Sequence, residues 1–425
     1  MILLKNGKLL TKQNDFMTVD VLIEDHKIKE IAPMIHADDA MIIELNQKLI
    51  APGFIDVHVH LREPGYTHKE TIETGSKAAA KGGFTTIAAM PNTLPAPDCE
   101  AHLTHIQTLI KKDAKIRVIP YATITKNQSG ETLVDFKALK KHGVIGFSDD
   151  GHGVQTTQTM FEAMKQAAKL NLPIVAHCEE DSLLYGGYVH DGEYAKQNGH
   201  RGISTLTESV QIARDMMLAK AAGVHYHVCH ISTKDSVALV RFAKSQGINI
   251  TCEVSPHHLI LSDLDIVDHH ANFKMNPPLR GREDVEACIN GLLDGTIDCI
   301  ATDHAPHTKE EKARGLADAP FGIVGLETAF PLMYTYFVKT NKMTLAHLIA
   351  CMSEKPAQVF NLPYGSLTEG SVADIVILDL DKEQIIDSNT FVSMGKNTPF
   401  NGVKAIGWPV MTIASGNIVY QEMNC

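Results

Sequence analysis

The sequence predicts an α/β protein, a (β/α)8 barrel with a small flanking β domain formed by both chain ends. Two observations predict the barrel. Short apolar strands alternate with amphipathic helices through residues 51–365, and polar residues that can bind metal recur just after those strands. Residues 1–50 and 366–425 instead show short strands separated by turns, too few at either end to bury a core alone. We therefore expect the two ends to form one domain, with a doubly wound sheet as the alternative for the middle.

Alternating apolar and polar residues predict the strands of the end domain. Asn6 with Gly7, and residues 24–26, supply turn residues between the first of them. We expect mainly antiparallel pairing. The predicted strands are residues 1–4, 19–23, 27–31, 41–45, 370–378, 403–406, 410–413 and 417–419.

The middle of the chain contains eight candidate strands with helical stretches between most of them. Thr67 and Glu70 have the spacing of a capping box, which would open a helix that Gly82 and Gly83 end. The strands are residues 54–57, 85–90, 116–122, 144–147, 174–176, 225–229, 248–253 and 299–302. The other predicted helices are residues 98–113, 157–170, 204–222, 233–246 and 283–294.

Composition excludes several classes of partner. A formal net charge of −11 argues against nucleic acid or an anionic membrane surface. No apolar run approaches membrane-spanning length, and no secretory apolar segment follows Met1. The eight cysteines form no Cys-x-x-Cys pair, which is typical of reduced thiols in a cytoplasmic protein.

The first barrel strand ends in two histidines one residue apart. Strand side chains alternate between faces, so His58 and His60 point the same way and can share one metal ion. Such a pair alone is weak evidence, because chance pairs occur. Four later strands, however, also end in residues that can bind metal, and active sites of barrels lie at the carboxyl ends of the strands. These residues are Asp149 and Asp150, His177, His230, and Asp303 followed by His304.

This set contains nitrogen and carboxylate ligands, which suits zinc, with manganese or cobalt as alternatives. Without His304 and with only one of the adjacent aspartates, four histidines and two aspartates are still too many for one tetrahedral ion, so a pair of ions with a bridging hydroxide is expected. Asp149 and Asp150 face opposite ways, and alternation does not choose between them. Cys178 and Cys229 are predicted to turn away from the ligand face and to pack in the core.

Motifs through the whole barrel resemble the amidohydrolase superfamily, and most closely its bacterial class I dihydroorotases. The opening motif is Gly-Phe-Ile-Asp-Val-His-Val-His at residues 53–60. The others, in chain order, are His-Leu-Arg-Glu-Pro-Gly at 60–65, Met-Pro-Asn-Thr at 90–93, Phe-Ser-Asp-Asp-Gly at 147–151, Ala-His-Cys-Glu at 176–179, Cys-His-Ile-Ser-Thr at 229–233, Ser-Pro-His-His at 255–258, Lys-Met-Asn-Pro-Pro-Leu-Arg at 274–280, Ala-Thr-Asp-His-Ala-Pro-His at 301–307 and Pro-Phe-Gly at 320–322.

The resemblance implies a specific ligand set. His58, His60 and Asp303 would hold one zinc ion, His177 and His230 the second, and Asp150 with a hydroxide would bridge the two. Many relatives bridge with a carbamylated lysine after the fourth strand, and residues 144–151 contain no lysine. Asp149 is then interpreted as a turn or capping residue.

The implied reaction is the reversible closure of N-carbamoyl-L-aspartate to L-dihydroorotate with loss of water, a step of de novo pyrimidine biosynthesis. Asp303 would be the general base. Arg62 would bind the substrate carboxylate, on the same face as His60 if the strand continues that far. The resemblance implies that the substrate contacts are His60, Arg62, Asn92, Asn276, His307, Phe321 and Gly322.

Several further expectations accompany this reading. His257, His258 and His304 are predicted to be supporting or packing residues. The charged residues 308–314 favour a solvated loop or helix turn over a mobile cover of the site. We expect a homodimer and consider an association with aspartate carbamoyltransferase.

Two other functions compete. A dihydropyrimidinase, hydantoinase or allantoinase would share the barrel and metals, but the absent lysine and the presence of Arg62, Asn92 and His307 argue against it. A non-catalytic assembly subunit should have lost ligands, and this chain retains all six.

Overall fold

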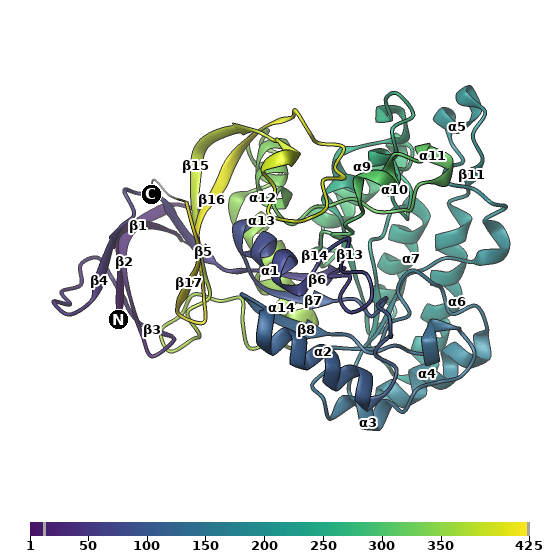
Figure 1. The fold of residues 1–425 in the computed structure, drawn as a ribbon, viewed down its shortest axis with the longest axis horizontal. Helices are drawn as coiled ribbons and strands as arrows, with labels where there is room; N and C mark the ends of the chain where they lie inside the picture. Colours follow the sequence, from purple (N-terminus) through teal and green to yellow (C-terminus); the bar gives the residue numbers. More distant parts are fainter. Residues whose placement is uncertain (12–13, 423–425) are drawn as a thin grey trace.

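The computed structural model describes residues 1–11 and 14–422. A large sheet that contains both ends of the chain lies beside a body of parallel strands and surrounding helices (Figure 1). The strands of that sheet are drawn in purple and yellow, the colours of the first and last residues, at one side of the molecule. No helix in the described part of the chain is long and apolar enough to cross a membrane.

The end sheet has the strand order β17-β16-β15-β5-β1-β2-β3, and β4 also pairs with β1. The two ends join where β15 runs antiparallel to β5. This β5 spans the predicted domain boundary at residue 50, and both β4 and β5 run parallel to β1. The strands are β1 (Ile2–Leu10), β2 (Phe16–Glu24), β3 (Lys27–Ala32), β4 (Met41–Glu44), β5 (Leu49–Pro52), β15 (Ile375–Ile385), β16 (Lys404–Ala414) and β17 (Asn417–Gln421).

Alternation along β15 gives the end sheet two buried faces. Ile375 and Ile377 pack in a core of this sheet, whereas Val376 and Leu378 pack in the main core with the barrel. Arg117 reinforces this junction, because its Nη1 atom donates to Oδ2 of Asp374 at 2.8 Å. The sheet is thereby fixed to the amino-terminal side of the parallel strands.

The middle of the chain forms parallel strands in ring order. One sheet contains β6, β7 and β8, and another contains β9, β12, β13 and β14. Single parallel bridges join the two sheets through Phe147, which pairs with Ala122 and Ile174, and through Val59 with His304. The strands are β6 (Phe54–Val59), β7 (Phe84–Ala89), β8 (Arg117–Pro120), β9 (Ile174–Ala176), β12 (Tyr226–Val228), β13 (Ile250–Val254) and β14 (Cys299–Ile300).

Helices follow most of these strands. The main ones are α1 (Ile72–Lys81), α2 (Glu100–Asp113), α4 (Thr157–Lys169), α6 (Leu206–Ala222), α7 (Lys234–Ser245) and α9 (Arg282–Leu293). Shorter helices are α3 (Phe136–Lys140), α5 (Glu193–Asn198), α8 (Pro256–Ile260), α10 (Lys309–Lys312), α11 (Gly315–Asp318), α12 (Ala329–Met333), α13 (Leu345–Met352) and α14 (Glu354–Val359). A small pair, β10 (Val189–His190) and β11 (Gly202–Ile203), lies outside the ring and was not predicted.

Three local predictions were wrong. Helix α1 begins after Thr71, whose side chain accepts from the backbone N–H of Thr74, so the capping box is one turn later than predicted. Glu70 is instead buried and accepts from Met394 N–H. Asn6 and Gly7 form a bulge inside β1, because Asn6 adopts a φ of 54° without reversing the chain.

The third wrong prediction concerns where two of the strands begin and end. Residues 144–147 form no continuous strand. Only Phe147 makes β-bridges, and the neighbouring strands β8 and β9 are themselves short. The segments 403–406 and 410–413 were predicted as separate strands, but residues 404–414 form the single strand β16. The predicted turn at residues 24–26 is confirmed, with Asp25 and His26 both at positive φ.

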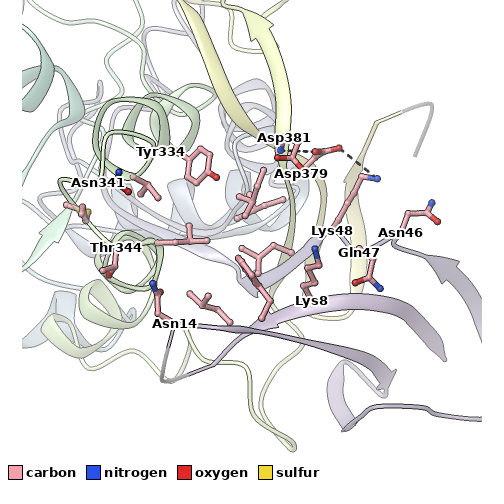
Figure 2. A pocket seen from close by; sticks show the side chains of 18 of the residues that line it. Lys8, Asn14, Asn46, Gln47, Lys48, Tyr334, Asn341, Thr344, Asp379 and Asp381 are labelled. Carbon is pink, nitrogen blue, oxygen red and sulfur yellow. Dashed lines mark hydrogen bonds and ion pairs between the residues drawn. The ribbon is translucent and has the colours of Figure 1, made fainter.

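A cavity of about 810 Å³ lies at the junction between the end sheet and the barrel. Figure 2 shows Lys8 and Lys48 on the side of the sheet and Tyr334 and Thr344 on the side of the helices. Lys48 pairs with Asp379 at 3.9 Å across one edge. The residues that line this cavity include no histidine or cysteine.

Candidate active site

Six histidine and aspartate side chains converge at the carboxyl ends of the parallel strands. They come from five parts of the ring: His58 and His60 are at the end of β6, and the other four follow the Phe147 bridge, β9, β12 and β14. Every one of the six is buried. They are His58, His60, Asp150, His177, His230 and Asp303, the residues predicted as metal ligands.

One half of the cluster combines the first and last strands. Nε2 of His60 lies 2.9 Å from Oδ1 of Asp303, and Nε2 of His58 lies 3.5 Å from the same oxygen. The potential ligand atoms of these three side chains all lie within 4.8 Å of one another. This spacing is compatible with one shared cation.

The other half contains Asp150, His177 and His230. Nδ1 of His177 lies 3.0 Å from Nε2 of His230, and these atoms lie 3.9 Å and 3.7 Å from Oδ1 of Asp150. Asp150 also approaches the first half, because its Oδ1 lies 3.4 Å from Nε2 of His58 and its Oδ2 lies 3.5 Å from Nε2 of His60. The Asp150 carboxylate therefore lies between the two halves.

The neighbouring aspartate has a different environment. Oδ1 of Asp149 accepts from the backbone N–H groups of Ile124 and Thr125 at 2.8 Å and 3.2 Å. These bonds anchor the loop after β8. The Asp149 carboxylate is therefore directed at this loop and not at the histidines. Geometry thus favours Asp150 over Asp149 as the aspartate that contacts both halves of the cluster.

Three buried polar atoms of the six side chains lack a hydrogen-bond partner, and one of them is Nδ1 of His230. The other two, Nε2 of His58 and Oδ1 of Asp150, lie 3.4 Å apart. Buried polar atoms in proteins are nearly always satisfied, so such a pair needs an explanation. A divalent cation between a nitrogen lone pair and a carboxylate oxygen would satisfy both, and the residues present fit a metal centre.

The two aspartates of the cluster are held in the charged form. Burial alone would raise the pKa of Asp303, but the hydrogen bond from His60 and the nearby His58 and His230 outweigh it and lower the pKa. Burial likewise opposes ionisation of Asp150, yet neighbouring His58 and the hydrogen bond with His230 hold its pKa well below the usual range. Both side chains are therefore acceptors at neutral pH.

A cationic side chain lies beside this cluster. Strand β6 ends at Val59, and Arg62 has a φ of 61°, so the condition for placing Arg62 on the same strand face as His60 is not met. A turn brings the guanidinium to His307 instead: Nε donates to the Pro306 carbonyl at 3.2 Å, and Nη2 lies 3.3 Å from Nε2 of His307. The field of Asp303 reaches Arg62 and opposes the lowering of its pKa by burial.

The remaining predicted substrate contacts lie in three places around the cluster. Nε2 of His307 lies 2.7 Å from the Phe321 carbonyl, which brings Arg62, His307 and the Phe321–Gly322 backbone together. Asn276 is across the cluster, where its Nδ2 lies 3.4 Å from Nε2 of His177. Asn92 contacts a predicted ligand directly, because its Oδ1 lies 2.8 Å from Nδ1 of His60.

Comparisons with known proteins decide the family. A family model described as Dihydro-orotase-like matches residues 47–236. A dihydroorotase of Listeria innocua is 60% identical over 422 residues, which cover 99% of this chain and 99% of that protein. The chain belongs to the dihydroorotase family. A dihydroorotase of Bacillus cereus is 57% identical over 420 residues, covering 99% of this chain and 98% of the relative.

Solved structures of other proteins have the same fold as this chain. An L-hydantoinase (dihydropyrimidinase) from Arthrobacter aurescens is 28% identical, with a TM-score of 0.88 over 99% of this chain and 96% of that one. A dihydropyrimidinase from Brevibacillus agri has a TM-score of 0.84 at 24% identity over 99% and 95% of the two chains, a likeness of fold alone. The predicted fold class, a barrel with a flanking β domain, is confirmed.

Two acidic residues beside the cluster of this dihydroorotase-family chain were missed. Oε1 of Glu253 lies 2.6 Å from Nδ1 of His58, and Oε1 of Glu179 lies 3.8 Å from Nε2 of His177. Asn276 also donates to Oε2 of Glu179 at 2.8 Å. The signal for Glu253 was present in the sequence, because it is an acidic residue within an otherwise uncharged predicted strand. Such a residue is rarely buried unless it is paired.

The cysteine prediction needs one correction. Cys178 packs in the core and its Sγ lies 3.2 Å from the hydroxyl of Tyr226. The sulfur of Cys229, however, lies within 4.8 Å of ligand atoms of His58 and Asp150 and does not turn away from them. Strand β12 ends at Val228, so alternation no longer applies to Cys229. Among the described residues all seven cysteines are free, and Cys425 lies outside them.

The histidines excluded from the ligand set make other contacts. Nδ1 of His304 accepts from Gly325 N–H at 3.2 Å, and its Nε2 lies 3.4 Å from Oε2 of Glu70. Nε2 of His258 lies 2.9 Å from the Pro277 carbonyl, whereas Nε2 of buried His257 has no hydrogen-bond partner.

The charged segment at residues 308–314 includes helix α10. Most of its side chains are exposed, as expected for a solvated turn. Lys312 departs from that expectation: it is 5% exposed, and its Nζ donates to the carbonyls of Lys274 and Pro320 at 3.1 Å and 2.9 Å. These bonds anchor the helix beside Phe321 and Gly322.

Proposed function

We propose that this chain catalyses the reversible ring closure of N-carbamoyl-L-aspartate to L-dihydroorotate, a step of de novo pyrimidine biosynthesis, as a zinc-dependent cyclic amide hydrolase. The observation that carries the proposal is the convergence of six buried histidine and aspartate side chains beside the Arg62 guanidinium. Full-length relatives named dihydroorotase support the same substrate.

Two zinc ions are proposed, one for each half of the cluster. His58, His60 and Asp303 would hold the first, and His177 and His230 the second, with Asp150 between them. Bound zinc would polarise the substrate carbonyl and lower the pKa of water near it. Each histidine offers one ring nitrogen to the cluster, and Asp150 offers both oxygens, which supports this division.

Asp303 is proposed to move the proton. In the direction of ring opening, its carboxylate accepts a proton from the attacking water and passes it to the ring nitrogen as the C–N bond breaks. Ring closure reverses these transfers: Asp303 takes a proton from the ureido nitrogen as the C–N bond forms and returns it to the hydroxyl group on the carboxyl carbon, which leaves as water. The low pKa of Asp303 favours the charged base between turnovers.

Arg62 is proposed to bind the carboxylate that distinguishes dihydroorotate from simpler cyclic amides. Its planar fork suits two parallel hydrogen bonds with a carboxylate. Asn92, Asn276, His307 and the backbone of Phe321 and Gly322 would border the ring. The charge and position of Arg62 therefore favour dihydroorotate over hydantoin or dihydrouracil.

A direct experiment compares substrates. Purified protein is stripped with a chelator, reloaded with Zn²⁺ and assayed with L-dihydroorotate and with hydantoin. We expect turnover of L-dihydroorotate that disappears in Asp303→Asn. Turnover of hydantoin alone would favour a hydantoinase, and no turnover with zinc bound would favour a non-catalytic assembly subunit. The homodimer, the association with aspartate carbamoyltransferase and the cytoplasmic location stay predictions.

A further inference from the structure

A line of buried polar side chains leaves the metal-ligand cluster through the interior of the barrel. Oε1 of Glu253 lies 2.6 Å from Nδ1 of His58, and its Oε2 lies 3.1 Å from Nε2 of His227. Nδ1 of His227 in turn lies 2.7 Å from Oγ1 of Thr251. Glu253 and Thr251 are two residues apart in β13, so both point to the same face of that strand.

The line ends at the opposite side of the barrel. Nε2 of His225 lies 2.7 Å from Oγ1 of Thr251. Both residues line a cavity of about 560 Å³ that is separate from the histidine and aspartate cluster. Glu253, His58 and His227 are at most 1% exposed, so water does not compete for their hydrogen bonds.

The chemistry of this line fixes the direction of each hydrogen bond. A carboxylate only accepts, so His58 must donate through Nδ1–H and His227 through Nε2–H. His227 Nδ1 then accepts from the Thr251 hydroxyl, whose oxygen accepts from His225. His58 is left with its lone pair on Nε2, the unpartnered atom that faces Asp150.

Glu253 also reaches the other half of the cluster. Its Oε1 accepts from the backbone N–H of His230 at 3.4 Å. His230 has a φ of 31°, a conformation that side chains with a Cβ atom rarely adopt. One carboxylate therefore contacts the ring of His58 and the backbone of His230, which belong to different halves of the metal-ligand cluster.

We propose that Glu253 is a positioning residue for the metal centre. It holds His58 in the tautomer that presents Nε2 as a ligand, and it secures the backbone that carries His230. His227 and Thr251 fix the Glu253 carboxylate in turn. This inference rests on the proposed function, because it assumes that the cluster binds zinc. Partners of this kind typically change metal affinity by about 10–100-fold.

A purely structural role makes a different prediction. If Glu253 only satisfied buried groups, its replacement would lower the free energy of unfolding but leave the zinc affinity of the folded protein unchanged. Zinc affinity and the spectrum of bound Co²⁺ therefore separate the two roles. Neither readout depends on turnover.

The test uses Glu253→Gln in the full chain. Glutamine keeps the shape, but its amide group turns a donor toward either His58 Nδ1–H or His227 Nε2–H. Zinc affinity is measured by competition with a chromophoric chelator, and the visible absorption of the Co²⁺-loaded protein reports ligand geometry. We expect zinc binding about 10–100-fold weaker than in the unchanged protein, together with an altered Co²⁺ spectrum.

Asp215→Asn is the matched control. Asp215 is also a fully buried acid of the barrel, but it pairs with Arg214 at 2.7 Å and Tyr226 at 2.9 Å and contacts none of the six ligands. We expect wild-type zinc affinity and an unchanged Co²⁺ spectrum in Asp215→Asn. Wild-type affinity and spectrum in Glu253→Gln would overturn the inference.

A second variant covers the case in which Glu253→Gln does not fold. His227→Gln removes the imidazole that fixes Oε2 of Glu253 while leaving the contact between Glu253 and His58. We expect a several-fold loss of zinc affinity, and an unchanged affinity would overturn the inference. Failure of the unchanged protein to bind zinc would instead contradict the proposed function together with the role of Glu253.

Discussion

Nε2 of His60 lies 2.9 Å from Oδ1 of Asp303, although 243 residues separate them in the chain. The contact exists because the first and last strands of the ring are neighbours: His60 N–H donates to the carbonyl of His304, and Val59 bridges to His304. The proposed base and a proposed ligand of the same ion are therefore positioned by ring closure itself. Substitutions where the first and last strands of the ring meet should therefore affect both metal binding and proton transfer.

The adjacent aspartates provide a matched pair of variants. Asp150→Asn should bind fewer zinc ions and lose most turnover, because it removes the charge between His58 and His230. Asp149→Asn should retain the zinc content, because Asp149 contacts Ile124 and Thr125. Metal analysis of the two purified variants distinguishes them, and loss of zinc from Asp149→Asn alone would reverse the assignment.

Arg62→Gln should discriminate between substrates. A buried hydrogen bond with a charged group contributes about 1.5–3 kcal/mol, so KM for L-dihydroorotate should rise by about 10–100-fold. Zinc content should not change, since Arg62 is not a proposed ligand. Dihydrouracil, which lacks the carboxylate, serves as the comparison substrate. An equal effect of Arg62→Gln on both substrates would contradict carboxylate binding by Arg62.

Much of the site could be predicted from where polar residues follow apolar strands. His58, His60, His177 and His230 are recognisable because each interrupts or ends a short apolar run, and the barrel brings such positions together. Strand alternation failed where strands end, as at Cys229 and Arg62, since the backbone leaves extended geometry there.

Contacts between segments that are distant in the sequence could not be predicted from local sequence patterns. The hydrogen bonds of Glu253 with His58 and His227 depend on which strands are neighbours across the barrel. The capping prediction at Thr67 and Glu70 failed for a similar reason. Glu70 is drawn into a buried contact with Ser393, a residue 323 positions away, while Thr71 caps the helix.

Gly322→Ala should impair the wall of the site near His307. An added Cβ would lie 2.6 Å from Cβ of Ala305 and 3.2 Å from Nε2 of His307, and Gly322 has a φ of 129°. Strain of this kind costs about 1–3 kcal/mol. We expect a lower free energy of unfolding and a higher KM, with zinc content retained. Gly370→Ala, also at positive φ but in open space, controls for backbone strain alone.

His190 should contribute to the pH dependence of stability. Burial, with the nearby positive charge of Arg280, lowers its pKa from 6.5 to about 4. The unfolded chain therefore binds this proton at a higher pH than the folded protein does. The stability contributed by the neutral side chain is fully present above pH 6.5 and is lost as the pH falls toward 4.

His190→Gln should reduce that loss. Urea unfolding at about pH 7 and about pH 5 is expected to give a smaller decrease in the free energy of unfolding for this variant than for the unchanged protein. Exposed His68 offers the control, since His68→Gln should leave the decrease unchanged. An identical pH dependence in His190→Gln would contradict the role of burial at this position.

The most direct test of the account is steady-state hydrolysis of L-dihydroorotate by the zinc-reloaded protein, with Asp303→Asn and Asp215→Asn measured in parallel. We expect turnover by the unchanged protein and by Asp215→Asn, and a loss of at least about 10²-fold in Asp303→Asn. Turnover that persists in Asp303→Asn, or a zinc-loaded protein that opens hydantoin but not L-dihydroorotate, would contradict it.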